Sequence, residues 1–125
     1  MNLVDDPRFS QALELFNSGA WYEAHDAFEE LWHEQMDPER KLLQAIVQIA
    51  VAHVHLERGN TRGCTILLGE GLGRLKPSLP VALGLDLTAL QSVVSDRLSA
   101  LQSGQDPEVF PPPRLLPVTL SLIHI

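Results

Sequence analysis

Two side chains suited to acid/base chemistry or metal binding, His25 and Glu29, stand four residues apart in a segment with apolar residues at helical spacing. On a helix, positions i and i+4 lie on the same face, so the imidazole and the carboxylate would be neighbours. At about 100° per residue, His25 falls at the centre of the apolar face to which Trp21 and Phe28 belong. The pattern therefore predicts that this pair points toward the protein interior.

The next predicted helix carries polar residues that could meet this pair. Gln44, Gln48 and His55 fall within a narrow angular band of a segment that is otherwise apolar nearly all round, while His53 faces elsewhere. The turn between the two helices is short, which makes them antiparallel neighbours. Counting back from the turn places the earlier histidine and glutamate level with the two glutamines. We therefore expect a buried polar seam with His55 at one end.

Three interpretations of this seam stay open. Buried amides and carboxylates are costly when unpaired, so the seam could be a hydrogen-bonded network that sets the register of two helices. Imidazole and carboxylate are also metal ligands and acid/base groups, so His25, Glu29 and His55 are candidate metal ligands, and His25 and Glu29 are candidate catalytic residues. The same groups could line a pocket for a polar ligand. We favour the structural network and expect no cofactor, with a bound metal as the alternative.

Helix start and stop signals divide the chain into five predicted helices. Asp6-Pro7 and Asp37-Pro38 combine a capping carboxylate with a proline at the first helical position, and Asn60 and Asp86 are further caps. Glycines or prolines follow the helix ends. No segment shows the period-two alternation of a strand. The predicted helices cover residues 7–18, 21–35, 38–58, 61–75 and 87–101.

A weak internal repeat indicates that a helix-turn-helix unit occurs twice. The order of a glycine, a small residue and large residues resembles that of tetratricopeptide helices, but two units are fewer than the roughly three that such arrays need. We therefore predict an all-α fold, a compact bundle of about five helices built from two helix-turn-helix units plus a C-terminal helix and a Pro-rich tail. The pattern of Gly19, Ala24, Phe28 and Trp32 recurs as Gly59, Cys64, Leu68 and Leu72.

The character of the chain changes after Gly104. We expect residues 1–104 to form the helical domain and residues 105–119, which are rich in proline, to lie extended across the bundle or hang free. Residues 120–125, Leu-Ser-Leu-Ile-His-Ile, read as a translation of a transposon-end adapter used in sequencing libraries. We predict that these six residues are not native, and we give His124 no functional role.

Composition excludes several classes of function. The formal net charge is -7 and the basic residues form no run, which argues against binding to nucleic acid or an anionic membrane. No apolar stretch is long enough to span a bilayer, so we expect no membrane insertion. The single cysteine excludes an internal disulfide and fits a reducing compartment, and the start of the chain lacks signal-peptide features. We predict a cytoplasmic protein that binds a protein partner through its acidic outer helix face, which suits a basic partner, or through a groove between the two helical hairpins. A helix face left uncovered could support self-association.

Two blocks of sequence resemble the family known as domain of unknown function 309. The first is Trp21-Tyr22-Glu23-Ala24-His25-Asp26 with Glu29-Glu30-Leu31-Trp32, and the second is Gln44-x-x-x-Gln48-x-Ala50 with His55-Leu56, Gly59-Asn60 and Gly63. The resemblance covers roughly residues 16–75 and implies a small multi-helical protein with no settled activity. The departures are mild: Asp26 and Ala45 stand where glutamate and glycine are usual, and Cys64 replaces alanine. The motif positions map onto Glu23, His25, Glu29, Trp32, Gln44, Gln48, His55, Gly59 and Asn60.

These motif positions overlap the predicted seam, and we take them as candidate binding or network residues. The sequence as a whole favours a non-enzymatic protein-interaction domain. The alternative is a metal-binding or acid/base hydrolytic enzyme that uses His25, Glu29 and His55.

Overall fold

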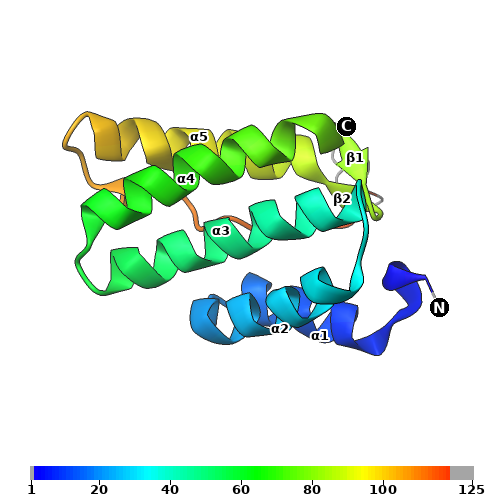
Figure 1. The fold of residues 1–125 in the computed structure, drawn as a ribbon. Coiled ribbons are helices and arrows are strands. Elements are labelled where there is room, and N and C mark those ends of the chain that lie inside the picture. Colours follow the sequence, from blue (N-terminus) through cyan, green and yellow to red (C-terminus); the bar gives the residue numbers. More distant parts are fainter. Residues whose placement is uncertain (1, 119–125) are drawn as a thin grey trace.

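Five α-helices account for most of the described residues, 2–118, of the computed structural model (Figure 1). Three of the predicted caps are formed: the side chains of Asp6, Asn60 and Asp86 accept hydrogen bonds from the backbone N–H groups of the first helical turn. The predicted cap at Asp37 is wrong, because Pro38 is the N-cap residue of the third helix and makes no side-chain cap bond. The helices are α1 (Pro7–Asn17), α2 (Trp21–Glu34), α3 (Glu39–Glu57), α4 (Thr61–Leu75) and α5 (Leu87–Gln102).

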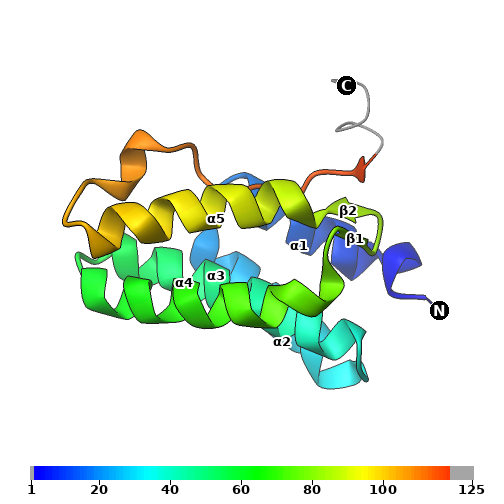
Figure 2. The same ribbon diagram turned by 90° about the horizontal axis from the view of Figure 1, so that it is seen from above.

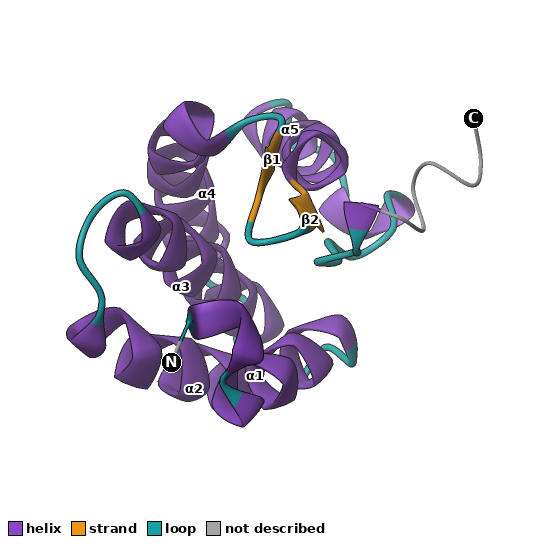
Figure 3. Cartoon of the chain, turned by 90° about the vertical axis from the view of Figure 1, so that its right-hand side faces the viewer, coloured by secondary structure: helices purple, strands orange, loops and turns teal. Residues whose placement is uncertain are grey.

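The helices form two layers. In the first, α3 lies between α2 and α4, and it makes its most extensive contacts with these two helices (Figure 1). The second layer, α1 and α5 with the chain that follows α5, covers one side of the first (Figures 2 and 3). This arrangement explains why α3 is apolar nearly all round, since it has neighbours on most sides. The all-α bundle of five helices is confirmed.

The predicted repeat of the helix-turn-helix unit is also confirmed. Gly19 and Gly59 both have a φ of +77° at the end of the first helix of each unit, a conformation that glycine adopts without steric cost. The small residues Ala24 and Cys64 are both fully buried in the second helix of their units. Small side chains at these positions let the paired helices approach closely.

A short β-hairpin between α4 and α5 was not predicted. Strands β1 (Val81–Ala82) and β2 (Leu85–Asp86) pair antiparallel, and positive φ values at Leu83 and Gly84 make the two-residue turn. Strands of two residues are too short to show an alternating pattern. Single turns of 3-10 helix occur at η1 (Leu3–Asp5), η2 (Lys76–Ser78) and η3 (Pro107–Val109).

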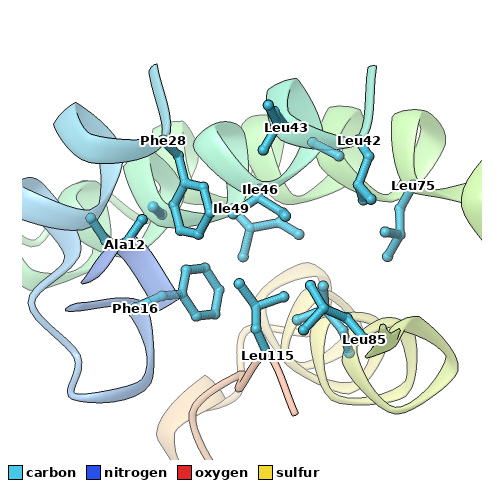
Figure 4. Packing of buried hydrophobic residues seen from close by; sticks show 14 of the residues in the cluster. Ala12, Phe16, Phe28, Leu42, Leu43, Ile46, Ile49, Leu75, Leu85 and Leu115 are labelled. Carbon is cyan, nitrogen blue, oxygen red and sulfur yellow. The ribbon is translucent and has the colours of Figure 1, made fainter. Parts of the chain in front are cut away.

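The proline-rich segment lies across the bundle rather than hanging free. Leu115 is buried in the core, between Phe16 and Leu85 in the view of Figure 4. Asn17 fastens its backbone, because the amide nitrogen of Asn17 donates to the Leu115 carbonyl at 3.0 Å and its oxygen accepts from the Leu115 N–H at 2.7 Å. The predicted adapter-derived residues 120–125, with His124, lie outside the described residues. No helix within residues 2–118 is long and apolar enough to cross a membrane.

Candidate functional site

The predicted pair His25 and Glu29 forms, but at the surface. The His25 side chain is 21% exposed, that of Glu29 is 47% exposed, and Nε2 of the imidazole lies 3.5 Å from the carboxylate. The other imidazole nitrogen, Nδ1, lies 3.2 Å from the Tyr22 carbonyl oxygen and 3.3 Å from the Asp26 carboxylate. All of these partners belong to α2, so the pair is a local arrangement on one helix.

The predicted seam between α2 and α3 is wrong. Gln48 is held by α4, since its side-chain nitrogen donates to Glu70 at 3.0 Å and its oxygen accepts from Arg74 at 3.1 Å. Within residues 2–118, no hydrogen bond joins His25 or Glu29 to the glutamines of α3. The angular position of a residue on α3 cannot decide between the two neighbouring helices, and here long charged side chains of α4 reach the glutamine. Gln44 is half-buried.

The three candidate metal ligands do not converge. His55 instead lies next to the cap of α4, with its Nδ1 atom 3.1 Å from the side-chain nitrogen of Asn60. The described part of the chain holds no group of three His, Cys, Asp or Glu side chains placed to bind a metal ion, which contradicts the predicted set of His25, Glu29 and His55. Among the other motif residues, Glu23 is exposed, and Trp32 is half-buried under the guanidinium of Arg40.

Among the described residues, the buried histidine is His53, which we predicted to face away from the seam. Its side chain is 2% exposed, and its ring lies 4.6 Å from that of Trp21. Nδ1 lies 2.8 Å from the Ile49 carbonyl oxygen and therefore carries the proton that it donates. Burial lowers the pKa of His53 to about 4, so the ring is neutral at pH 7. Nε2 is then a bare acceptor, and it is buried without a hydrogen-bond partner in the described structure.

The signal for His53 was present in the sequence. Leu42, Ile46, Ile49 and His53 follow one another at helical spacing, and all four are buried. An imidazole at the end of such a stripe has to be buried as well.

A cavity of about 550 Å³ adjoins His53. Trp21 from α2, Leu56 from α3 and residues 108–112 from the segment after α5 contribute to its walls. Arg97 of α5 also lines it and is only 5% exposed. Its Nε atom donates to the Pro111 carbonyl at 3.1 Å and Nη2 donates to the Phe110 carbonyl at 2.8 Å. This end of the bundle therefore combines a buried cation, a buried acceptor and an aromatic ring.

Residues 9–67 match the model of the family described as Domain of unknown function (DUF309). This match covers 59 of the 125 residues, slightly less than half of the chain, and shows that residues 9–67 are similar to that family. The predicted resemblance is confirmed, although the matched segment starts earlier and ends earlier than the residues we compared. No curated protein matches the chain.

The cavity lies partly outside the DUF309 segment. Trp21 and His53 belong to the segment, whereas Arg97 and the wall at residues 108–112 come from the chain that follows it. The surface pair His25 and Glu29 lies entirely within it. The DUF309 segment therefore contributes the imidazole and the aromatic ring of the cavity, and the C-terminal part contributes the cation.

Proposed function

We propose that the chain is a non-enzymatic binding domain and that the cavity beside His53 holds a small polar ligand. The observation that carries this proposal is the Nε2 atom of His53, a buried acceptor without a partner. Leaving such a group unpaired costs about 1–3 kcal/mol, so unpaired acceptors are rare in folded proteins. Nε2 is itself covered, so a ligand N–H or O–H would reach it, and remove this cost, after a small shift of the surrounding side chains.

The side chains around the cavity support binding rather than catalysis. None of the described residues that line it is a serine, threonine, cysteine or lysine, the usual nucleophiles. The imidazole, with a pKa of about 4, is a weak base at neutral pH. The nearby thiol of Cys64 is equally unsuited, because burial raises its pKa to about 11.

The test is a titration of isotope-labelled protein with small molecules grouped by charge and hydrogen-bonding capacity. The proposal expects that one group shifts the ring signals of His53 and Trp21 in a saturable manner. His53→Asn should abolish the shift of the Trp21 signals, because asparagine can still donate to the Ile49 carbonyl but offers no acceptor at the position of Nε2. The proposal fails if no group of compounds perturbs these signals, or if His53→Asn leaves the titration unchanged.

A second candidate function, docking of a basic protein partner on α2, rests on a different observation. Tyr22 is 53% exposed, and its ring lies 5.5 Å from that of His25 on a helix rich in acidic residues. Arg8 already neutralises one part of this surface through Glu30 and Glu34, at 3.2 and 2.7 Å. The part around Tyr22 remains for a partner with lysines or arginines.

Titration with an oligolysine peptide tests this second candidate. Binding should weaken with added salt and with Tyr22→Ala, whereas Ile66→Ala, at a similarly exposed residue on α4, should not affect it. Equal binding by both variants would refute docking at this surface.

A further inference from the structure

The cavity is lined by a buried positive charge, Arg97, and by exposed negative charges nearer the solvent. Arg97 is buried, and in the described part of the chain no carboxylate lies within 4.0 Å of its guanidinium. Only the neutral carbonyls of Phe110 and Pro111 accept its hydrogen bonds, and Nη1 donates to none of the described groups. The carboxylates of Glu108 and Asp106 attract the guanidinium only from beyond contact distance. An anionic ligand group in direct contact with Arg97, at the floor of the cavity, would therefore stabilise this buried cation further.

The outer part of the cavity has the opposite sign. Glu57 and Glu108 both line it, and both residues are exposed. They would repel a second negative charge on a ligand and attract an ammonium group. The remaining walls are largely apolar and include Leu56, Val109, Phe110 and Trp21.

We infer that the ligand is a zwitterion of the α-amino acid class, with its carboxylate on Arg97. Its ammonium group then lies between His53 Nε2 and the carboxylates at the rim of the cavity, Glu57 and Glu108. This inference rests on the proposed function of the cavity and names the ligand class for it. A single carboxylate supplies a contacting counter-ion for Arg97 at the floor. The ammonium N–H supplies the donor that Nε2 lacks once the side chains that cover this nitrogen shift. An apolar amino-acid side chain then contacts the aromatic and aliphatic wall.

Other small ligands satisfy fewer of these groups. A phosphate or a dicarboxylate would place excess negative charge near Glu57 and Glu108. A neutral amide could donate to His53 Nε2 and accept from Arg97, but it would bring no negative charge into contact with the buried guanidinium. An amine without a carboxylate would place a second cation near Arg97.

The test uses the fluorescence of Trp21 and three related probes. Trp32→Phe leaves Trp21 as the one tryptophan, since the chain has two, and its ring forms part of the cavity wall. Leucine is the zwitterionic probe, leucinamide lacks the carboxylate, and N-acetylleucine lacks the ammonium group. We expect leucine to change the Trp21 emission in a saturable manner, and each blocked probe to bind about tenfold more weakly, as for loss of one charge-assisted contact.

Variants of the rim provide a matched control. Glu57→Gln and Glu108→Gln remove charge from exposed side chains, so the fold should persist while leucine binds several-fold more weakly. Glu70→Gln removes an exposed carboxylate from α4, which does not line the cavity, and should leave leucine binding unchanged. Equal weakening by Glu70→Gln would show a general charge effect and would overturn the placement of the ammonium group.

The outcomes distinguish this inference from the proposed function. N-acetylleucine or leucinamide binding as tightly as leucine would overturn the zwitterion while leaving a ligand in the cavity. No response to leucine, together with shifts of His53 by another class of compound, would also overturn the zwitterion alone. If neither leucine nor any other class perturbs His53 and Trp21, both the inference and the proposed function fail.

Discussion

The burial of His53 makes the stability of the protein depend on pH in a specific way. The pKa of the imidazole falls from 6.5 to about 4 on folding, chiefly because burial disfavours its charged form. The nearby guanidinium groups of Arg97 and Arg114 act in the same direction. The carboxylates that face the same cavity, Glu57 and Glu108, are exposed and do not reverse the shift.

The sign and size of the effect follow from proton linkage. Between pH 6.5 and 4 the unfolded chain binds a proton at His53 that the folded protein does not, so stability is present above pH 6.5 and is lost as the pH falls toward 4. At 1.36 kcal/mol per pKa unit, this difference of pKa corresponds to about 3 kcal/mol. The effect is large compared with a typical stability of about 5–15 kcal/mol.

The assay is urea unfolding of the wild type and His53→Asn at a series of pH values from 7.5 to 4. The free energy of unfolding of the wild type should fall by about 3 kcal/mol more than that of the variant, because the contributions of all carboxylates cancel in the comparison. His33→Asn, which replaces an exposed histidine, should follow the wild-type profile. Parallel curves for the wild type and His53→Asn would refute the burial of a neutral imidazole.

Three further predictions concern packing. Leu115→Ala should lower the free energy of unfolding by about 2–5 kcal/mol and loosen the C-terminal segment. Leu116→Ala, at a residue 38% exposed, should change the free energy of unfolding by less than about 1 kcal/mol. Denaturant unfolding measures both variants, and equal effects would contradict the role of Leu115 as the anchor of this segment. Gly71→Ala should destabilise the protein, because the new methyl group would lie 3.0 Å from the buried side chain of Ile49. Gly69→Ala places its methyl group in open space and should stabilise the protein by up to about 1 kcal/mol. Thermal melting measures both, and a higher melting temperature for Gly71→Ala than for Gly69→Ala would contradict this packing. Cys64, whose pKa burial raises to about 11, should react with iodoacetamide only on unfolding, so rapid labelling of the native protein would disprove its burial.

The helices were predictable because their signals are local. Caps such as Asn60 and Asp86 act within one turn, and a glycine such as Gly59 ends a helix through its own backbone conformation. The hairpin at residues 81–86 was not predictable from alternation, because each strand has only two residues.

The candidate site was harder to predict because it depends on which helices become neighbours. The helical wheel placed His25 and Glu29 on one face but could not show that α3 presents Gln48 to α4 instead. His53 was identifiable by its spacing from Ile49, yet Arg97, which lines the same cavity, comes from α5, far away in the sequence. No local pattern joins these two residues. The cavity arises only when the segment after α5 folds back over α3.

The protonation state of His53 in the folded protein decides whether its Nε2 atom can accept a hydrogen bond from a ligand, and the long-range ¹H–¹⁵N spectrum of the imidazole at pH 7 measures it. We predict a neutral ring with the proton on Nδ1 and an unprotonated Nε2, which shifts on addition of leucine. A proton on Nε2, or an Nε2 signal that no ligand moves, would contradict the proposal that this nitrogen is a buried acceptor kept for a ligand.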